Sequence, residues 1–433
     1  MNTNYDLVNR EIIDITTKAP SYKKQEYKLV FRNKDDDINM RNLDSIEWQC
    51  DFNKTMDHVV ITTYMGAGDF AYDVFNNKDN IEVTINTFRD DVLYNSKTYK
   101  ALLVTVGNNS AGINANLDRA TLNKTGMNRV VFQLLEQEME IIRALKISGI
   151  FKKTNVKSFL LSAFYNNLSN VKIRNSKINP TINIVTPDNE NVYDHIPVPT
   201  GTRLIELPTF LQDTEYGVYK GDIGVYFKTI TNNKVNILNT FIYPLYTKTP
   251  PKEGKELIIY YAPTQFSKMN NSNYAVTNEN VKIVASELNI LEFKENILMD
   301  KGGSITATNP ETFLYYNDNI KNNKLTYDKD KVLTSVTYGT KDGLRNERYV
   351  GSEANLFKHI SKVMADSLDL VKVRWKFSDH TLLRPGMFTK VYYQNGRNVK
   401  VMQGVLQEYY TLYHQMSKIE ETIMLFKLGE VNE

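Results

Sequence analysis

The alternation of apolar and polar residues is most regular near the end of the chain. Between Leu370 and Ser378 every second residue is apolar, and the residues in between are mostly basic. Successive side chains of a β-strand point to opposite faces, so this pattern predicts a strand with one buried and one exposed face. The apolar set is Val371, Val373, Trp375 and Phe377, and the basic set is Lys372, Arg374 and Lys376.

Turn signals divide the residues that follow into further strands. Pro385 and Gly386 predict a turn, because proline fixes φ and glycine accepts positive φ. Asn395 followed by Gly396 is a strong hairpin signal. The final run, Thr422 to Leu428, is apolar on both faces, which indicates protein on each side of that strand. The last part of the chain therefore predicts a small antiparallel β-barrel that packs against a neighbour.

Residues 1–106 predict a second group of strands. Short runs rich in β-branched and aromatic residues are separated by clusters of Asn, Asp, Gly and Lys at hairpin-like spacing, which is typical of a β-barrel or sandwich. The runs are YKLVF, SIEWQCDF, HVVITTY, IEVTINTF and YKALLVTV.

The period changes in the middle of the chain. From Asn128 to Ser148 the apolar residues recur at three- and four-residue steps, which predicts an amphipathic helix. A second helix is expected to begin near Asn155, whose side chain suits the N-cap position. The strand-like runs VKIRN and INIVT follow. An inserted α/β unit is therefore expected here.

A short helix and a hairpin are predicted next. Pro208 suits the first turn of a helix, because its missing N–H is not needed there, and Gly217 is expected to end that helix. The residues from Tyr219 to Thr229 predict a hairpin with Gly221 and Asp222 at its turn.

These patterns together predict an α+β fold that is mainly β. Strands and Asn-rich loops alternate over residues 247–330, and a helix from about Glu353 leads into the terminal barrel. We expect two small antiparallel β-barrel domains, an inserted α/β domain and a mixed, β-rich middle domain. The predicted boundaries are residues 1–110 for the first barrel, 111–195 for the α/β domain, 196–350 for the mixed domain and 351–433 for the second barrel.

The composition indicates a globular chain without an electrostatic preference for nucleic acid. Of 433 residues, 41% are hydrophobic and 11% are aromatic, which is enough for several cores. The net charge of +3 is nearly balanced and argues against a nucleic-acid binder driven by charge. No secretion signal and no apolar window long enough to span a membrane are present, so we expect synthesis in a cytoplasm and no membrane insertion.

The sequence lacks the spacings that catalytic and cofactor sites require. Its single cysteine, Cys50, excludes an intrachain disulfide and a cysteine-based zinc site. The five histidines form no HExxH motif, and GxSxG, P-loop and Rossmann motifs are absent. Asp188 and Glu190 lack the spacing of a calcium loop. We therefore expect no metal, no cofactor and no enzymatic activity.

The end of the chain resembles the tube-forming β domains of bacteriophage tail baseplate hub proteins. The segments that carry the resemblance are LLRPGMFTKVYY, VMQGVLQEYYTLYHQ and IEETIMLF. In them Pro385 and Gly386 form the turn, Gly404 opens the next strand, and His414 lies at a corner before a final apolar strand. The stretch from Glu206 to Phe227 is similar to a second feature of the family, a Leu-Pro helix followed by a Tyr-Gly-aromatic hairpin.

The resemblance implies a structural protein of the virion, located in the tail baseplate and synthesised in the cytoplasm of a host bacterium. In this family a homotrimer presents two like-folded barrels per subunit and joins the sixfold tail tube to a threefold central spike. The implied partners are the spike protein, the tail tube or a tube-initiator ring, the tape-measure protein and surrounding baseplate proteins. DNA would pass through the channel transiently, without specific binding.

Subunit contacts are expected on the last strands. A channel through which DNA slides should avoid dense phosphate contacts, so the basic residues of the first of these strands are expected to face a neighbouring subunit. The expected interface residues are Lys372, Arg374, Lys376, Tyr392, Tyr409, Met424 and Phe426, and the expected structural turns are Pro385, Gly386, Asn395, Gly396 and Gly404.

Two alternative functions stay open. One is a tail-associated cell-wall hydrolase with a hub-like part. The other is a receptor- or carbohydrate-binding tail-tip protein, which the 27 tyrosines suggest. A trimeric mass without lysis of cell-wall substrate would favour the hub, whereas glycan binding by a monomer would favour the binding protein.

Overall fold

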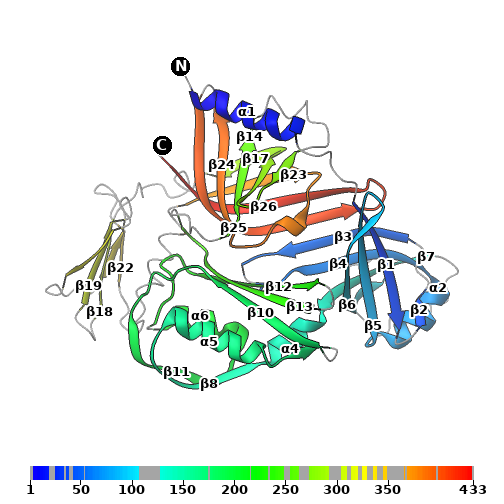
Figure 1. Cartoon of the computed structure of the whole chain (residues 1–433), viewed down its shortest axis with the longest axis horizontal. Helices are drawn as coiled ribbons and strands as arrows, with labels where there is room; N and C mark the ends of the chain where they lie inside the picture. The colour runs from blue at the N-terminus through cyan, green and yellow to red at the C-terminus, as the bar shows by residue number, and fades with distance from the viewer. Residues whose placement is uncertain are drawn as a thin grey trace.

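The structure is a computed structural model of the chain, and its strands outnumber its helices (Figure 1). The α+β, mainly β class predicted from the sequence is confirmed. The structure describes residues 3–18, 25–33, 36–38, 42–52, 54–106, 127–173, 176–214, 216–232, 235–247, 254–262, 273–291, 304–309, 314–319, 324–328, 335–338, 345–348, 365, 368–395 and 398–431.

One sheet of 15 strands contains strands from both ends of the chain. The strands that we call the N-terminal lobe are β1 (Gln25–Asn33), β2 (Asp36–Ile38), β3 (Asn42–Cys50), β4 (His58–Gly66), β5 (Ile81–Arg89), β6 (Val92–Val106) and β7 (Met127–Glu136). Short helical turns follow β4, namely α2 (Ala67–Asp69), η1 (Phe70–Val74) and η2 (Phe75–Asn77).

The C-terminal lobe supplies the other strands of this sheet. They are β14 (Glu256–Tyr261), β15 (Tyr274–Val276), β16 (Asn280–Val284), β17 (Glu287–Leu291), β23 (Asp369–Lys376), β24 (Phe388–Asn395), β25 (Asn398–His414) and β26 (Ile419–Glu430). The short helix η5 (His380–Leu382) follows β23. The strands expected between residues 370 and 428 are therefore confirmed.

The long strand β25 joins the two lobes. Its first half pairs with β24, and its residues Tyr409–His414 pair with Ser45–Cys50 of β3 (Figure 1). Its register against β26 shifts between Leu406 and Glu408, which marks a β-bulge near this transition. A bulge bends a strand and increases its twist, so one strand can serve both lobes. The ladders of the described residues close neither lobe into a barrel, so the barrels stay a prediction.

An amino-terminal helix, α1 (Thr3–Lys18), packs on the C-terminal lobe, and the sequence interpretation did not include it (Figure 1). Strand β14 shows why it fits there. Leu257 and Ile259 lie in the core of the lobe, whereas Ile258 and Tyr260 on the other face pack with the helix. A strand covered on both faces is apolar throughout, which explains the run ELIIYY. The buried stripe of the helix is Val8, Ile12 and Ile15.

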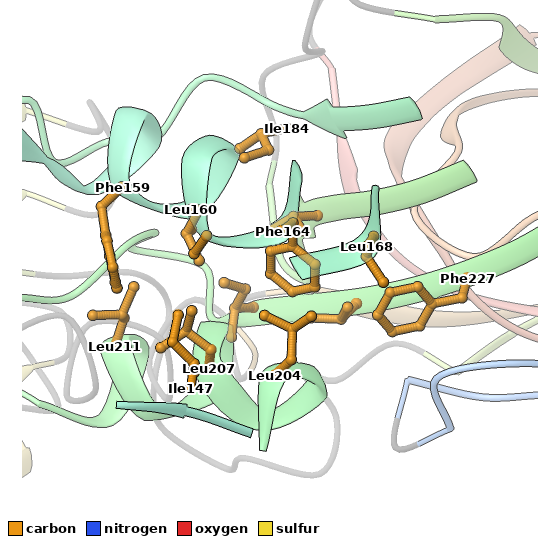
Figure 2. Packing of buried hydrophobic residues seen from close by; sticks show 14 of the residues in the cluster. Ile147, Phe159, Leu160, Phe164, Leu168, Ile184, Leu204, Leu207, Leu211 and Phe227 are labelled. Atoms are coloured by element: carbon orange, nitrogen blue, oxygen red, sulfur yellow. The ribbon is translucent and has the colours of Figure 1, made fainter. Parts of the chain in front are cut away.

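The middle domain places helices between a sheet and a two-stranded ribbon (Figure 1). Its core contains Phe159 and Phe164 of one helix packed with Leu204, Leu211 and Phe227 (Figure 2). The helices are α4 (Gln137–Ala144), α5 (Val156–Leu168), α6 (Leu207–Asp213) and the short η3 (Leu204–Glu206). The sheet contains β9 (Lys172–Ile173), β10 (Ser176–Ile184), β12 (Ile223–Asn232) and β13 (Val235–Pro244), and the ribbon pairs β8 (Lys146–Asn155) with β11 (Val192–Arg203).

The other face of the middle-domain sheet packs on the C-terminal lobe. Tyr226 and Tyr243 are buried in the same core as Trp375 and Phe426. The middle domain and the C-terminal lobe therefore share a continuous apolar contact.

Two local predictions for the middle of the chain are corrected. The helix expected from Asn128 to Ser148 is strand β7 followed by helix α4, because Val130, Phe132 and Leu134 alternate into the N-terminal core and β7 pairs with β4 and β6. The helix expected near Asn155 is confirmed as α5, and the Asn155 side chain accepts a hydrogen bond from the Ser158 backbone N–H at 2.8 Å.

The hairpin expected from Tyr219 to Thr229 is also different. The short helix that begins with Leu207 and Pro208 is confirmed and ends at Asp213, before Gly217. The hairpin that follows pairs β12 with β13. Gly221 and Asp222 precede β12, where their carbonyl oxygens accept hydrogen bonds from the residues after β13.

A separate five-stranded sheet covers part of the region after residue 300. Its strands are β18 (Ser304–Asn309), β19 (Leu314–Asn319), β20 (Lys324–Asp328), β21 (Ser335–Tyr338) and β22 (Arg345–Arg348). The helix expected from Glu353 lies outside the described residues except for Ala365. The predicted domain boundaries stay a prediction.

Candidate assembly interface

The basic residues predicted for a subunit contact lie on β23. Val371, Val373 and Trp375 are fully buried, and Lys372 between them is exposed, so the alternation is as expected. Arg374 is half-exposed. It donates from Nε to Glu421 of β26 and from Nη1 to Glu287 of β17 at 3.0 Å.

The two glutamates therefore more than offset the formal charge of Arg374. Lys376 is half-buried, and its backbone carbonyl accepts a hydrogen bond from Asn273. Lys372 is therefore the most exposed of the three basic residues on this strand.

The four remaining predicted interface residues are covered by the chain itself. Tyr392 is half-buried next to the α1 helix and stacks on Tyr260, with ring centroids 5.4 Å apart. Tyr409, Met424 and Phe426 lie in the core of the C-terminal lobe with at most 1% of their surface exposed. These three side chains pack within the chain and present no surface to a neighbouring copy.

The turn at Pro385 and Gly386 is a packing contact between the C-terminal lobe and the middle domain. Gly386 has φ of 78°, and a Cβ placed on it would lie 2.3 Å from the ring of Tyr243. Its N–H donates to Leu406 of β25 at 2.9 Å. A side chain at this position is excluded both by backbone conformation and by space.

The other predicted turn glycines differ in role. Gly404 lies inside β25, where a Cβ would lie 2.2 Å from the carbonyl oxygen of Lys427 on the neighbouring β26. It permits close approach of the strands rather than a turn. Asn395 pairs with Asn398 at the end of the β24–β25 hairpin, and Gly396 lies outside the described residues.

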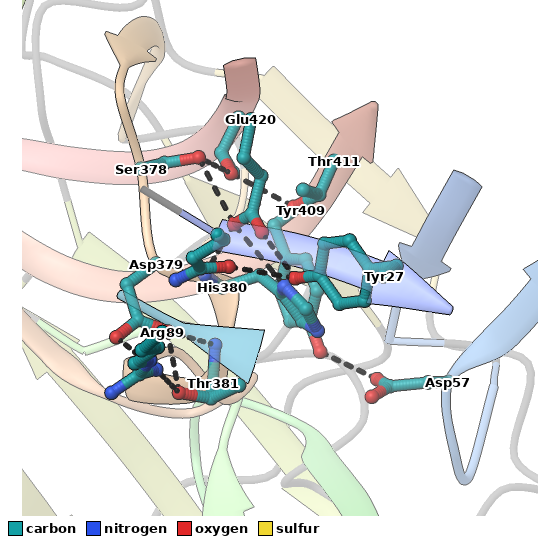
Figure 3. A network of polar contacts seen from close by, with 12 residues as sticks. Tyr27, Asp57, Arg89, Ser378, Asp379, His380, Thr381, Tyr409, Thr411 and Glu420 are labelled. Carbon is teal, nitrogen blue, oxygen red and sulfur yellow. Dashed lines mark hydrogen bonds and ion pairs between the residues drawn. The ribbon is translucent and has the colours of Figure 1, made fainter. Parts of the chain in front are cut away.

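A buried polar network connects the two lobes near the β25–β26 corner (Figure 3). Glu420 of β26 is fully buried and accepts hydrogen bonds from the Tyr27 hydroxyl of β1 and the His380 backbone N–H, each at 2.7 Å. The His380 ring has Nδ1 at 3.1 Å from Glu420, an ion-pair contact that is not a well-aligned hydrogen bond. The ring also stacks on Trp48 of β3, with centroids 4.2 Å apart.

Two further contacts tie the lobes together. Arg89 at the end of β5 donates to Asp379 at 2.6 Å, a mostly buried pair (Figure 3). Asp57, just before β4, accepts hydrogen bonds from Tyr409 at 2.5 Å and from Tyr226 of the middle domain at 3.0 Å. At Asp57, residues of the N-terminal lobe, the C-terminal lobe and the middle domain are therefore hydrogen-bonded together.

The charges of this network set the pKa values of its members. Burial alone lowers the pKa of His380, but the negative charge of Glu420 outweighs it, so the pKa is raised. Burial raises the pKa of Glu420, but the opposite charge of His380 and the hydrogen bonds from the Tyr27 hydroxyl and the His380 backbone N–H outweigh it, so the pKa is lowered. Both shifts favour the charged form of the group.

Sequence reasoning did not find this network. Its members come from opposite ends of the chain, so no spacing brings Tyr27, His380 and Glu420 together. One local signal was available in the sequence. Glu420 is a carboxylate just before the apolar run from Thr422 to Leu428.

The described part of the chain contains no group of three or more His, Cys, Asp or Glu side chains placed to hold a metal ion. Cys50 is buried, and burial together with the charges of Asp57 and Asp51 raises the pKa of its thiol. Of the helices that the structure describes, none is long and apolar enough to cross a membrane.

Comparison with solved structures finds tail proteins and a component of a secretion system. The chain is similar to a tail protein from Neisseria meningitidis MC58, with 10% identity and a TM-score of 0.45 over 93% of this chain and 96% of that chain. It is similar to the 43 kDa tail protein of prophage MuSo2 from Shewanella oneidensis, with 9% identity and a TM-score of 0.46 over 93% of this chain and 98% of that chain.

A third similar structure is an E. coli component of the type VI secretion system, with 10% identity and a TM-score of 0.41 over 93% of this chain and 77% of that chain. No protein-family model and no curated protein matches the sequence. The similar structures include a prophage tail protein, and a phage tail protein is the kind of protein that the sequence resemblance named. Identities and TM-scores this low carry no conclusion about the function or assembly of this chain.

Proposed function

We propose that this chain is a structural subunit of a phage tail baseplate, and that three copies form a hub ring between the sixfold tail tube and a threefold central spike. In this proposal the ring encloses part of the channel for DNA and the tape-measure protein. Its other partners are the tube or a tube-initiator ring and the surrounding baseplate proteins. The chain performs no catalysis.

The observation that carries this proposal is the ladder between β25 and β3. It makes one continuous sheet from strands at the two ends of the chain. Within the described residues this sheet does not close, and the backbone groups at the edge of an open sheet can pair with neighbouring copies. Three such sheets arranged around an axis supply six lobes, the number that a sixfold tube requires.

The contact between copies is proposed on the exposed side of β23. Lys372 is exposed there, and Arg374 with its two glutamates forms a group with a formal charge of −1. A surface that carries both signs of charge favours a partner with the complementary pattern. Attraction to DNA would require an excess of positive charge instead.

Solution mass together with a cell-wall assay tests the proposal. The purified chain should form a particle with three times the mass of one chain, measured by light scattering after gel filtration, and should not clear a peptidoglycan suspension. A monomer at every concentration would contradict the ring. Clearing of peptidoglycan that persists through purification would favour the hydrolase instead.

A further inference from the structure

A cleft of about 680 Å³ opens between the N-terminal lobe and the middle domain. Its walls come from the loop before β4, from β4, β7 and α4, and from η3 and α6. The volume is in the range that accommodates a short peptide segment or a small molecule. The apolar residues that line it are Met56, Leu134, Leu135, Ile205 and Phe210.

The carboxylates that line this cleft are already engaged. Asp57 accepts hydrogen bonds from two tyrosines, and Glu206 pairs with Arg203 at 3.2 Å. Arg143 and His58 also line the cleft, and no hydrogen bond or ion pair within the described residues engages either side chain. Among the charged side chains that line the cleft, Arg143 is therefore the one that no ion pair within the described residues engages.

The ribbon next to the cleft adds to this positive charge. Arg203 of β11 lies directly opposite Lys146 of β8. Like charges in directly opposed positions destabilise a strand pair, and Glu206 offsets only one of the two. Arg143, three residues before Lys146 along the chain, is also exposed. An anionic group bound in the cleft would be attracted by Arg143 and Arg203, which both line it.

We propose that this cleft binds an acidic segment of a partner protein, with an apolar side chain of that segment inserted against Leu135 and Phe210. Its carboxylates contact Arg143 and Arg203, because a guanidinium donates in a fork that matches a carboxylate. The apolar lining favours a peptide over a nucleic acid, which would present phosphates without an aliphatic or aromatic side chain. Since the walls belong to two parts of the chain, the bound segment holds the N-terminal lobe and the middle domain together.

Short fluorescein-labelled peptides test the proposal on the full chain. The probe is Glu-Glu-Phe-Glu-Glu, and the matched controls are Lys-Lys-Phe-Lys-Lys and Glu-Glu-Ser-Glu-Glu, each titrated with protein by fluorescence anisotropy. The probe should bind saturably, and both controls should bind at least about tenfold more weakly, because each lacks one of the two required features.

Surface variants then locate the binding. Arg143→Glu should weaken the probe at least about tenfold, since a charge-assisted contact is replaced by repulsion. Thr209→Trp should block the cleft, because Thr209 is exposed on α6 and lines it. Lys172→Glu changes the same charge at an exposed position outside the cleft and should leave binding unchanged. Circular dichroism and melting temperature confirm that each variant is folded.

Several results would overturn the proposal. They are no saturable binding of the probe, equal binding of the basic peptide, binding that survives both cleft variants, or displacement of the probe by a short single-stranded oligonucleotide. The oligomeric state is measured on the same samples. A failure of peptide binding is thereby distinguished from a failure of the trimeric hub.

Discussion

At the scale of single residues, Glu420 is the carboxylate on which the junction of the two lobes depends. It is fully buried, and its partners Tyr27 and His380 come from opposite ends of the chain. Removing one member of a buried pair leaves an uncompensated charge and costs about 3–5 kcal/mol.

Glu420→Ala should therefore lower the free energy of unfolding by about 3–5 kcal/mol in urea denaturation. Glu206→Ala removes a carboxylate from an ion pair in which both side chains are about half-exposed, and it should cost less than about 1 kcal/mol. Similar losses in the two variants would show that Glu420 does not hold the lobes together.

The same pair predicts how stability depends on pH. The raised pKa of His380 gives stability that is complete below its ordinary value of 6.5 and is lost as pH rises through the folded pKa. The lowered pKa of Glu420 gives stability that is complete above its ordinary value of 4.5 and is lost as pH falls through the folded pKa. The contribution of the pair is therefore largest between these two values.

His380→Gln should remove the alkaline part of this dependence. Urea unfolding of the wild type from about pH 5 to about pH 9 should show a decline toward high pH that is smaller in the variant. Equal slopes in both proteins would show that another group titrates.

Gly386 permits a second test at this scale, because Gly201 provides a matched control. Both have positive φ, 78° and 95°, but a Cβ would meet the Tyr243 ring only at Gly386 and nothing within 4 Å at Gly201. Gly201→Ala should cost about 1 kcal/mol from backbone strain, and Gly386→Ala should cost about 1–3 kcal/mol more from the clash. Denaturant midpoints of the two variants measure the difference, and equal losses would contradict the packing argument.

At the scale of elements, α1 is the helix that covers the second face of the C-terminal lobe. Ile12 is 2% exposed against β14, whereas its neighbour Ile13 is 50% exposed. Ile12→Ala should therefore lower the free energy of unfolding by about 2–4 kcal/mol, and Ile13→Ala by less than about 0.5 kcal/mol. If the two variants unfold at the same urea concentration, the helix does not dock as described.

The elements that sequence reasoning identified are those with local signals. Strand β23 follows from its alternation, α5 from the cap at Asn155, and α6 from Pro208. The stretch of β7 was misassigned because apolar residues at Val131, Leu134 and Leu135 also fit a helical period. The helix α1 was not predicted because the buried residues described on it, Val8, Ile12 and Ile15, are separated by many polar ones.

The contacts that join the lobes could not be predicted from local patterns. The pairing of β25 with β3 and the hydrogen bond from Tyr27 to Glu420 connect residues more than three hundred positions apart. The sequence predicts a subunit contact at Met424 because a strand that is apolar on both faces needs protein on each side. The chain itself supplies the cover for that side chain.

At the scale of the whole molecule, the shared sheet makes the lobes dependent on each other. β3 has β4 on one side and β25 on the other, and β7 lies between β4 and β6. The predicted first domain, residues 1–110, lacks both β7 and β25, so its sheet would have unpaired strands in its interior.

A fragment of residues 1–110 should therefore not fold alone. Its amide proton NMR spectrum should lack dispersion, whereas the full chain should unfold in a single cooperative transition of both lobes. A dispersed spectrum from the fragment would contradict the dependence.

Electron cryomicroscopy of the purified assembly tests the hub proposal most directly. The proposal predicts a ring with threefold symmetry in which each copy contributes two β lobes around a central channel, with Lys372 near the boundary to the next copy. A particle without threefold symmetry, or one whose two lobes do not both border the channel, would contradict it.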